Sequence, residues 1–102
     1  MPIGIDLIEI KNVEKKIQEN SGFLEHVLSD DECSKFQIQS LAGKIAAKEA
    51  IIKTGFLKPG ELLKIQILTD DSGKPNVYTA DGELISGLEI SISHTRDTAI
   101  AI

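Results

Sequence analysis

Four ionisable side chains in one predicted helix have the types and the spacing that phosphate chemistry requires. Within residues 41–54, Lys44 and Lys48 are four positions apart, and so are Glu49 and Lys53. Side chains four positions apart lie on one face of a helix. A carboxylate among lysines suits a polyanion held through a metal, because the carboxylate binds Mg²⁺ and the ammonium groups neutralise phosphate oxygens. The plainer alternative is a solvated face whose Glu49–Lys53 pair contributes about 0.3–0.5 kcal/mol.

Two further residues with chemical potential lie on or beside predicted strands. Asp6 interrupts an apolar segment at residues 3–10. Because burying an unpaired carboxylate is costly, Asp6 must reach a cation, a hydrogen-bond donor or water; a strand-end aspartate that simply faces solvent is the alternative. His94 follows the alternating segment 88–93 and has the parity of its apolar residues, which would direct its ring toward the core. A lone histidine in such a place is more often structural than catalytic.

The sequence excludes several other kinds of site. Cys33 is the only cysteine, and no histidine accompanies it, so we interpret it as a small apolar residue. With one cysteine and two histidines, metal sites of the cysteine–histidine type lack ligands. No glycine-rich loop follows a Walker or dinucleotide-binding pattern, and no serine lies in a nucleophile elbow.

Composition predicts one small globular domain over residues 1–102. Such a domain buries only about 60–65% of its unfolded surface, so association with further copies would supplement its core. A net charge of −5 and only four aromatic residues argue against a nucleic-acid partner. The absence of a basic leader and of a long apolar run argues against a signal peptide or a membrane span, and we expect a cytoplasmic protein.

Patterning and turn residues predict an α+β domain in which an N-terminal strand and two or three helices pack on a largely antiparallel sheet. The clearest helix is the segment 41–54, rich in alanine, leucine, lysine and glutamate and ended by Gly55. Ser29 and Glu32 have the spacing of a capping box and predict a helix from about residue 30 to 39. The remaining predicted elements are a strand at 3–10, a helix at 11–19, a helical turn at 23–28, strands at 62–69 and 76–79 joined by a turn at 70–75, and strands at 88–93 and 99–102.

In this order and at this spacing, these features resemble the holo-acyl-carrier-protein synthase family of 4′-phosphopantetheinyl transferases. The resemblance covers nearly the whole chain and implies that family's fold. The motifs that carry it are Gly4-Ile5-Asp6 in the first strand, Lys48-Glu49-Ala50 with Lys53 in the helix, Gly73-Lys74-Pro75 in the hairpin, and Ser91-Ile92-Ser93-His94-Thr95 before the last strand.

The resemblance implies a reaction and a partner. The enzyme would transfer 4′-phosphopantetheine from coenzyme A to a serine hydroxyl of an apo acyl carrier protein, as in fatty acid biosynthesis, and release 3′,5′-ADP. Magnesium would be required. The family forms trimers with sites between neighbouring subunits, so a homotrimer is expected.

The resemblance also implies residue roles. Asp6 and Glu49 would bind the metal, and together with Lys53 they would form the catalytic set. The phosphates and the remainder of coenzyme A would be bound by Lys44, which stands where the family usually has arginine, and by Lys48, Lys53, Ser93, His94 and Thr95.

Three departures keep alternatives open. The segment 32–41 is shorter than in the family, and residues 54–60 replace a glycine-rich stretch. Residues 11–28 mix lysines with glutamates where the family has arginines that dock an acidic carrier protein, which predicts weaker steering or a less acidic partner. A catalytically weakened homologue that binds coenzyme A or a partner protein is therefore the second hypothesis. A plain structural domain is the third.

Overall fold

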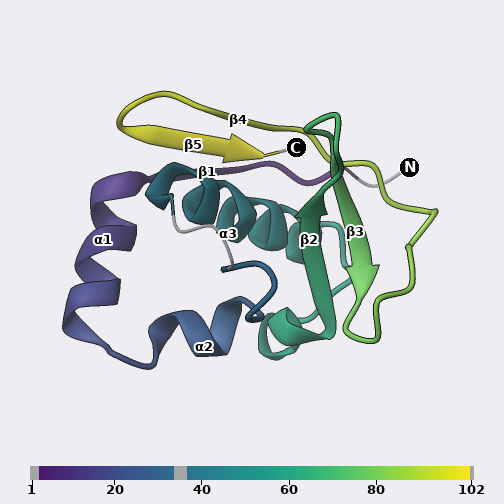
Figure 1. Ribbon diagram of the computed structural model, residues 1–102, viewed down its shortest axis with the longest axis horizontal. Helices are drawn as coiled ribbons and strands as arrows, with labels where there is room; N and C mark the ends of the chain where they lie inside the picture. Colours follow the sequence, from purple (N-terminus) through teal and green to yellow (C-terminus); the bar gives the residue numbers. More distant parts are fainter. Residues whose placement is uncertain (1–2, 34–36, 102) are drawn as a thin grey trace.

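A helix of 16 residues, α3 (Ile38–Lys53), runs along one face of a three-stranded antiparallel sheet (Figure 1). The structure is a computed structural model and describes residues 3–33 and 37–101. The first and last described segments lie side by side, because β1 pairs with β5 from Asp6 opposite Ala101 to Glu9 opposite Thr98. In spatial order the strands are β1 (Asp6–Glu9), β5 (Thr98–Ala101) and β4 (Ile92–His94).

The other elements surround α3 on its remaining sides. Helices α1 and α2 follow β1 and pack near the N-terminal half of α3, while a two-stranded hairpin packs near its C-terminal half (Figure 1). Their bounds are α1 (Ile10–Glu19), α2 (Phe23–Val27), the 3₁₀ helix η1 (Pro59–Lys64), β2 (Ile65–Thr69) and β3 (Pro75–Thr79).

Helix α3 is buried on almost every side because its apolar residues are spread around the helix rather than confined to one face. Its four alanines, at positions 42, 46, 47 and 50, are each at most 3% exposed, so neighbouring elements approach its backbone closely. One hydrophobic cluster joins its first half to α1 and α2, and a second joins its second half to the β2–β3 hairpin. The helix is thus the frame on which every other element is placed.

Two glycines have conformations or neighbours that another residue would not tolerate. A Cβ atom on Gly4 would lie 1.9 Å from the backbone oxygen of Ala50, so only glycine allows the N-terminal segment to lie this close to α3. Gly55 follows the helix with a φ of +85°, which is the left-handed conformation that commonly ends helices.

The predicted α+β class and most predicted elements are confirmed, but several boundaries were wrong. Residues 30–33 form a turn rather than the start of a helix; positions 34–36 of that prediction lie outside the described residues. The strand expected from Leu62 begins at Ile65, because η1 occupies the preceding residues. Of the strand expected over 88–93, only the end forms a strand: β4 spans Ile92–His94, the residues that pair with β5.

The last predicted strand starts one residue earlier than expected, at Thr98, and Ile102 lies outside the described part of the chain. No helix in that part has the length and apolar character needed to cross a bilayer.

Candidate functional site

Asp6 and Glu49, which are distant in sequence, line the same cavity. Asp6 comes from β1 and Glu49 from α3, and the cavity between them has a volume of about 540 Å³. Helix α1 contributes polar and basic groups and α2 contributes apolar ones. The full lining is Asp6, Ile8, Asn12, Val13, Lys15, Lys16, Glu19, Phe23, Val27, Ile45 and Glu49.

Lys53 does not line this cavity, but it links the first strand to the end of α3 through Asp6, which does. Its Nζ lies 3.1 Å from Oδ1 of Asp6 and donates a hydrogen bond of 2.8 Å to the backbone oxygen of Ile5. The Asp6 side chain is 18% exposed, whereas that of Lys53 is 54% exposed and open to solvent. An ammonium group therefore accompanies the carboxylate of Asp6 and remains accessible to an incoming anion.

Gly4 is the local reason that Asp6 reaches this place. Because Gly4 lies against the backbone of Ala50, the strand crosses α3 within one turn of Glu49 and Lys53. The Gly-Ile-Asp sequence thus has a structural meaning: the glycine permits the close approach, and the aspartate two residues later benefits from it.

The donor set of the cavity fits magnesium. Asp6 and Glu49 face the cavity from β1 and α3, and a third carboxylate in the lining, Glu19 of α1, pairs with Lys15. Over residues 3–33 and 37–101 no three His, Cys, Asp or Glu side chains cluster as a metal site. Mg²⁺ commonly binds one or two protein carboxylates and completes its shell with substrate phosphates and water. Asp6 and Glu49 offer that number of ligands, and the adjacent lysines suit a phosphate-bearing substrate.

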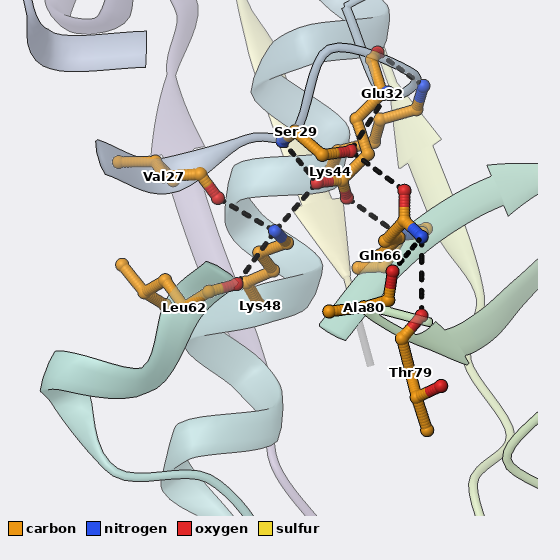
Figure 2. Close-up of polar contacts among 10 residues, drawn as sticks. Val27, Ser29, Glu32, Lys44, Lys48, Leu62, Gln66, Thr79 and Ala80 are labelled. Atoms are coloured by element: carbon orange, nitrogen blue, oxygen red, sulfur yellow. Dashed lines mark hydrogen bonds and ion pairs between the residues drawn. The ribbon is translucent and has the colours of Figure 1, made fainter. Parts of the chain in front are cut away.

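Lys48 does not belong to this cavity, which corrects the expectation that it binds phosphate. Its side chain is fully buried on another face of α3, and its Nζ lies 2.7 Å from Oε1 of Glu32 (Figure 2). The same Nζ donates to the backbone oxygens of Val27 and Leu62. Burial lowers the pKa of Lys48, and the Glu32 carboxylate opposes that shift. All three ammonium protons are engaged, so none is free for a ligand.

Lys44 also points away from the cavity. Its Nζ donates a hydrogen bond of 2.8 Å to the backbone oxygen of Glu32, and partial burial lowers the pKa of Lys44. The expected role of Lys44 in binding coenzyme A is not supported by this position. The alternative of a solvated lysine face is contradicted as well, because Lys44 and Lys48 share a face that packs against the turn at residues 29–33 (Figure 2).

The three expected coenzyme A residues at the chain end lie apart from the cavity. Ser93 and His94 are exposed on the edge strand β4, contrary to the expectation that His94 faces the core. Nδ1 of His94 lies 3.3 Å from the backbone oxygen of Thr95. The Thr95 hydroxyl accepts hydrogen bonds from the backbone of Asp97 and Thr98 and so closes the turn between β4 and β5. Within one chain, these residues and the two carboxylates do not form a single site.

Glu32 is the important residue that sequence reasoning misread. The capping-box bonds with Ser29 do form: the Ser29 backbone N–H donates to Oε1 of Glu32 at 2.9 Å, and the Glu32 N–H donates to the Ser29 hydroxyl. Glu32 also accepts from the backbone N–H of Ile67 and binds Lys48. The sequence showed only the Ser29–Glu32 spacing, because the other partners of Glu32 are 16 and 35 positions away.

A second cavity, of about 880 Å³, lies on the other side of the N-terminal segment. It is mainly apolar and runs between Gly4, the end of α3 and residues 87–91. Ile3 and Phe56 line it and are 75% and 54% exposed, so it is open to solvent in a single chain.

Comparisons with known proteins agree on one family. A family model described as the 4'-phosphopantetheinyl transferase superfamily matches residues 2–102. The chain is 38% identical over 109 residues to a holo-[acyl-carrier-protein] synthase of Geobacillus sp. (strain WCH70), with 97% of this chain and 90% of that protein covered.

Two solved structures have the same fold. One is a holo-[acyl-carrier-protein] synthase of Helicobacter pylori in complex with coenzyme A, with a TM-score of 0.81, 32% identity, and coverage of 97% of this chain and 95% of that one. The other is a holo-(acyl-carrier-protein) synthase of Bacillus anthracis in complex with CoA (3',5'-ADP), with a TM-score of 0.77, 34% identity, and coverage of 98% and 90%.

Proposed function

This chain belongs to the holo-[acyl-carrier-protein] synthase family of 4′-phosphopantetheinyl transferases, and on that premise we propose how its own residues perform the transfer. The reaction moves 4′-phosphopantetheine from coenzyme A to an apo acyl carrier protein. The serine oxygen of the carrier forms a bond to the phosphorus that bears pantetheine. The bond from that phosphorus to the bridging oxygen breaks, and 3′,5′-ADP leaves while the serine loses its proton.

Asp6 and Glu49 would hold Mg²⁺ between them. The observation that carries this assignment is that both line one cavity although they come from different elements. When bound, the ion supplies positive charge that offsets the charge developing on the diphosphate. Coenzyme A oxygens and water would complete its shell.

Lys53 would orient the diphosphate. Its ammonium lies beside Asp6 and is more than half exposed, so it can hydrogen-bond to a phosphate oxygen while it stays beside Asp6. The carboxylates of the cavity are this chain's candidates for accepting the serine proton, because general bases must lie within hydrogen-bond reach of the group they deprotonate.

His94, Ser93 and Thr95 would serve a neighbouring subunit. They are exposed on and directly after the edge strand β4 and do not line the cavity of their own chain, so an association that brings β4 of one copy to the cavity of another would complete the site. Exposed apolar residues on β1 and in the segment before it supply a surface for such association: Ile3, Ile5 and Leu7 are 75%, 49% and 64% exposed. We propose the homotrimer on these grounds.

Helix α1 would dock the carrier protein. It brings Lys15 and Lys16 to the cavity, and Lys16 also lies over the Phe23 ring, 5.7 Å from its centroid. Glu19 lines the same cavity and pairs with Lys15 at 4.0 Å. Because opposite charges alternate here, electrostatic steering of an acidic carrier would be modest.

The direct test is mass spectrometry of apo carrier proteins incubated with this protein, coenzyme A and Mg²⁺. We expect a mass gain of one phosphopantetheine on at least one carrier and no gain when EDTA replaces Mg²⁺. A panel without any mass gain, combined with tight binding of coenzyme A in calorimetry, would instead support the catalytically weakened binding module. That second candidate is favoured by one observation, the removal of Lys44 and Lys48 from the phosphate site.

A further inference from the structure

We propose that Lys48 is a positioning residue for the transfer reaction. Its buried ammonium group holds together α2 and α3, which form two walls of the cavity lined by Asp6 and Glu49, and so fixes the direction of the Glu49 side chain. This inference rests on the proposed function. It assigns to Lys48 a role through other residues, since Lys48 itself touches neither the cavity nor a ligand.

The contacts of Lys48 join three separate parts of the chain. Its Nζ donates to the backbone oxygen of Val27 at 2.7 Å, where α2 ends, and to that of Leu62 at 2.8 Å, within η1. The third bond goes to Oε1 of Glu32 at 2.7 Å. Because an ammonium group has three protons and all three are used, a displacement of any partner breaks a buried hydrogen bond.

Glu32 anchors this ammonium from the other side. Its two carboxylate oxygens also accept from the backbone N–H groups of Ser29 and Ile67, at 2.9 and 2.7 Å. The Ser29 hydroxyl donates onward to Gln66, whose amide donates to the backbone oxygen of Thr79 in β3 (Figure 2). The pair is therefore connected to the hairpin as well as to α2 and α3.

The hydrogen bonds of Lys48 act on residues that line the cavity of Asp6 and Glu49. Val27, whose carbonyl accepts from Lys48, lines the cavity, and so does Glu49, the next residue along α3. Neighbouring side chains on a helix project about 100° apart around its axis, so a rotation of α3 moves both together. When Lys48 is held by three acceptors, rotation of α3 is restricted, and Glu49 keeps its direction toward the side of Asp6.

Stability alone is a poor explanation for this arrangement. The desolvation of two charges offsets much of the free energy that their attraction contributes. Proteins with apolar residues of similar volume at such positions are often as stable or more stable. The fully buried pair lies between two hydrophobic clusters that could have continued through it. A role in placing the cavity walls accounts for a charged pair at this position.

Three variants and one control separate positioning from stability. Lys48→Arg keeps the charge but replaces three diverging protons with a planar fork. Lys48→Met removes the ammonium and leaves Glu32 unpaired, and the double variant Lys48→Met with Glu32→Met fills the space with apolar side chains. Lys64→Met is the matched control, because the Lys64 side chain is 70% exposed and, in the part of the chain that the structure describes, its ammonium pairs with Glu61 alone.

Transfer rates would be measured with coenzyme A, Mg²⁺ and apo carrier protein. Each rate is divided by the folded fraction, measured by circular dichroism at the assay temperature. The activity per folded molecule can then be compared even for a destabilised variant. Amide hydrogen exchange, followed by mass spectrometry without ligands, gives a readout independent of activity.

We expect kcat per folded molecule to fall about 10- to 100-fold in the double variant and less in Lys48→Arg, as for other groups that orient metal ligands. KM for the carrier protein should change by less than about twofold, because the carrier surface is untouched. Exchange should accelerate locally in α2, whereas global destabilisation alone would accelerate it evenly.

Two results would overturn the inference. One is wild-type kcat per folded molecule in Lys48→Arg and the double variant; the other is uniform acceleration of exchange with no local change in α2. A failure of the proposed function is distinguishable, because the wild-type protein and Lys64→Met would then both fail to modify any carrier.

Discussion

Two carboxylates, Asp6 and Glu49, line one cavity and are the proposed ligands of the metal ion. Each could be identified in the sequence from its context: an acid in an apolar strand, and an acid among lysines in a helix. Their common cavity follows only from the fold. The sequence likewise singled out Lys53 as a candidate but did not predict its ion pair with Asp6, because the two residues are 47 positions apart.

Removal of one carboxylate should abolish turnover. We expect Glu49→Ala to lower the transfer rate by more than about 100-fold, since even groups behind metal ligands are typically worth 10–100-fold. Within residues 3–33 and 37–101 the Glu49 side chain has no hydrogen-bond or ion-pair partner, so the melting temperature should stay close to that of the wild type.

The matched control for this prediction is Glu83→Ala. Glu83 is an exposed acid after the hairpin and lines neither cavity. Its rate should equal that of the wild type. Transfer is measured by mass spectrometry of the carrier protein. If Glu49→Ala retained undiminished Mg²⁺-dependent transfer, the role assigned to Glu49 would be refuted.

The reading of Lys48 shows where residue-level reasoning fails. A lysine in a helix next to a glutamate indicates a charged surface, and the family resemblance reinforced a phosphate role. The structure buries Lys48 completely against Glu32, a pairing between residues 16 positions apart in different segments. Local spacing rules describe neighbours along a helix and say nothing about such partners.

At the scale of elements, α3 and the close approach of the N-terminal segment determine the site. The helix, the hairpin and the turn glycines could be predicted, because propensity, alternation and turn chemistry act locally. The end of the short β4 strand and the turn at residues 30–33 could not be predicted, because contacts with distant segments decide both. Strand β4 pairs with β5, and Glu32 accepts hydrogen bonds from Lys48 and Ile67.

Gly4→Ala should damage both the fold and the reaction. The added Cβ would lie 1.9 Å from the Ala50 backbone oxygen, so the N-terminal segment must shift. We expect a loss of about 1–3 kcal/mol in the free energy of unfolding, the usual cost of overpacking, measured by urea titration. The transfer rate should also fall, because the shift carries Asp6 away from Glu49.

Gly60→Ala provides the comparison for this substitution. A Cβ on Gly60 would meet nothing within 4 Å. Its unfolding midpoint and its rate should match the wild type. If Gly4→Ala behaved in the same way as Gly60→Ala, the close approach would not be what places Asp6.

The hairpin turn should depend on pH through Asp70. Its Oδ1 accepts from the Ser72 hydroxyl at 2.6 Å and from the backbone N–H groups of Ser72 and Lys74, and these bonds hold the pKa of Asp70 below its usual range. A lowered pKa in the folded state means that ionised Asp70 stabilises the fold above about pH 4. The contribution is lost as the pH falls through that value toward the lowered pKa.

Melting curves of Asp70→Ala and wild type test this sign. At pH 7 the variant should melt at a lower temperature, and the difference should shrink steadily as the pH is lowered below about 4. A difference that stayed constant down to acidic pH would mean that charge on Asp70 does not support the turn.

At the scale of the whole molecule, one copy leaves apolar residues of β1 and of the segment before it exposed. The fold has a radius of gyration of 12.6 Å, yet Ile3, Ile5 and Leu7 remain exposed along one edge of the sheet. His94 is exposed on the opposite edge strand, away from the carboxylate cavity. The α+β class could be predicted from composition and patterning, whereas the exposed apolar edge required knowledge of which side of β1 faces α3.

Association should therefore depend on this edge. We expect the wild-type protein to sediment as a trimer and Leu7→Glu to dissociate and lose transfer activity, because a carboxylate would be buried in an apolar contact. Leu63→Glu, at an exposed leucine of η1 on the other side of α3, should remain associated. A monomeric wild-type protein at assay concentration, or a trimeric Leu7→Glu, would contradict the shared site.

In the proposed site, Asp6 and Glu49 bind one Mg²⁺ ion beside the diphosphate of coenzyme A. Calorimetric titration of coenzyme A into wild type, Asp6→Asn, Glu49→Gln and the double variant, with and without Mg²⁺, tests it directly. Ligands of one ion act as a unit, so each single variant should remove the Mg²⁺-dependent gain in affinity and the double variant should remove no more. Independent, additive losses, or an affinity of the wild type that ignores Mg²⁺, would contradict the account.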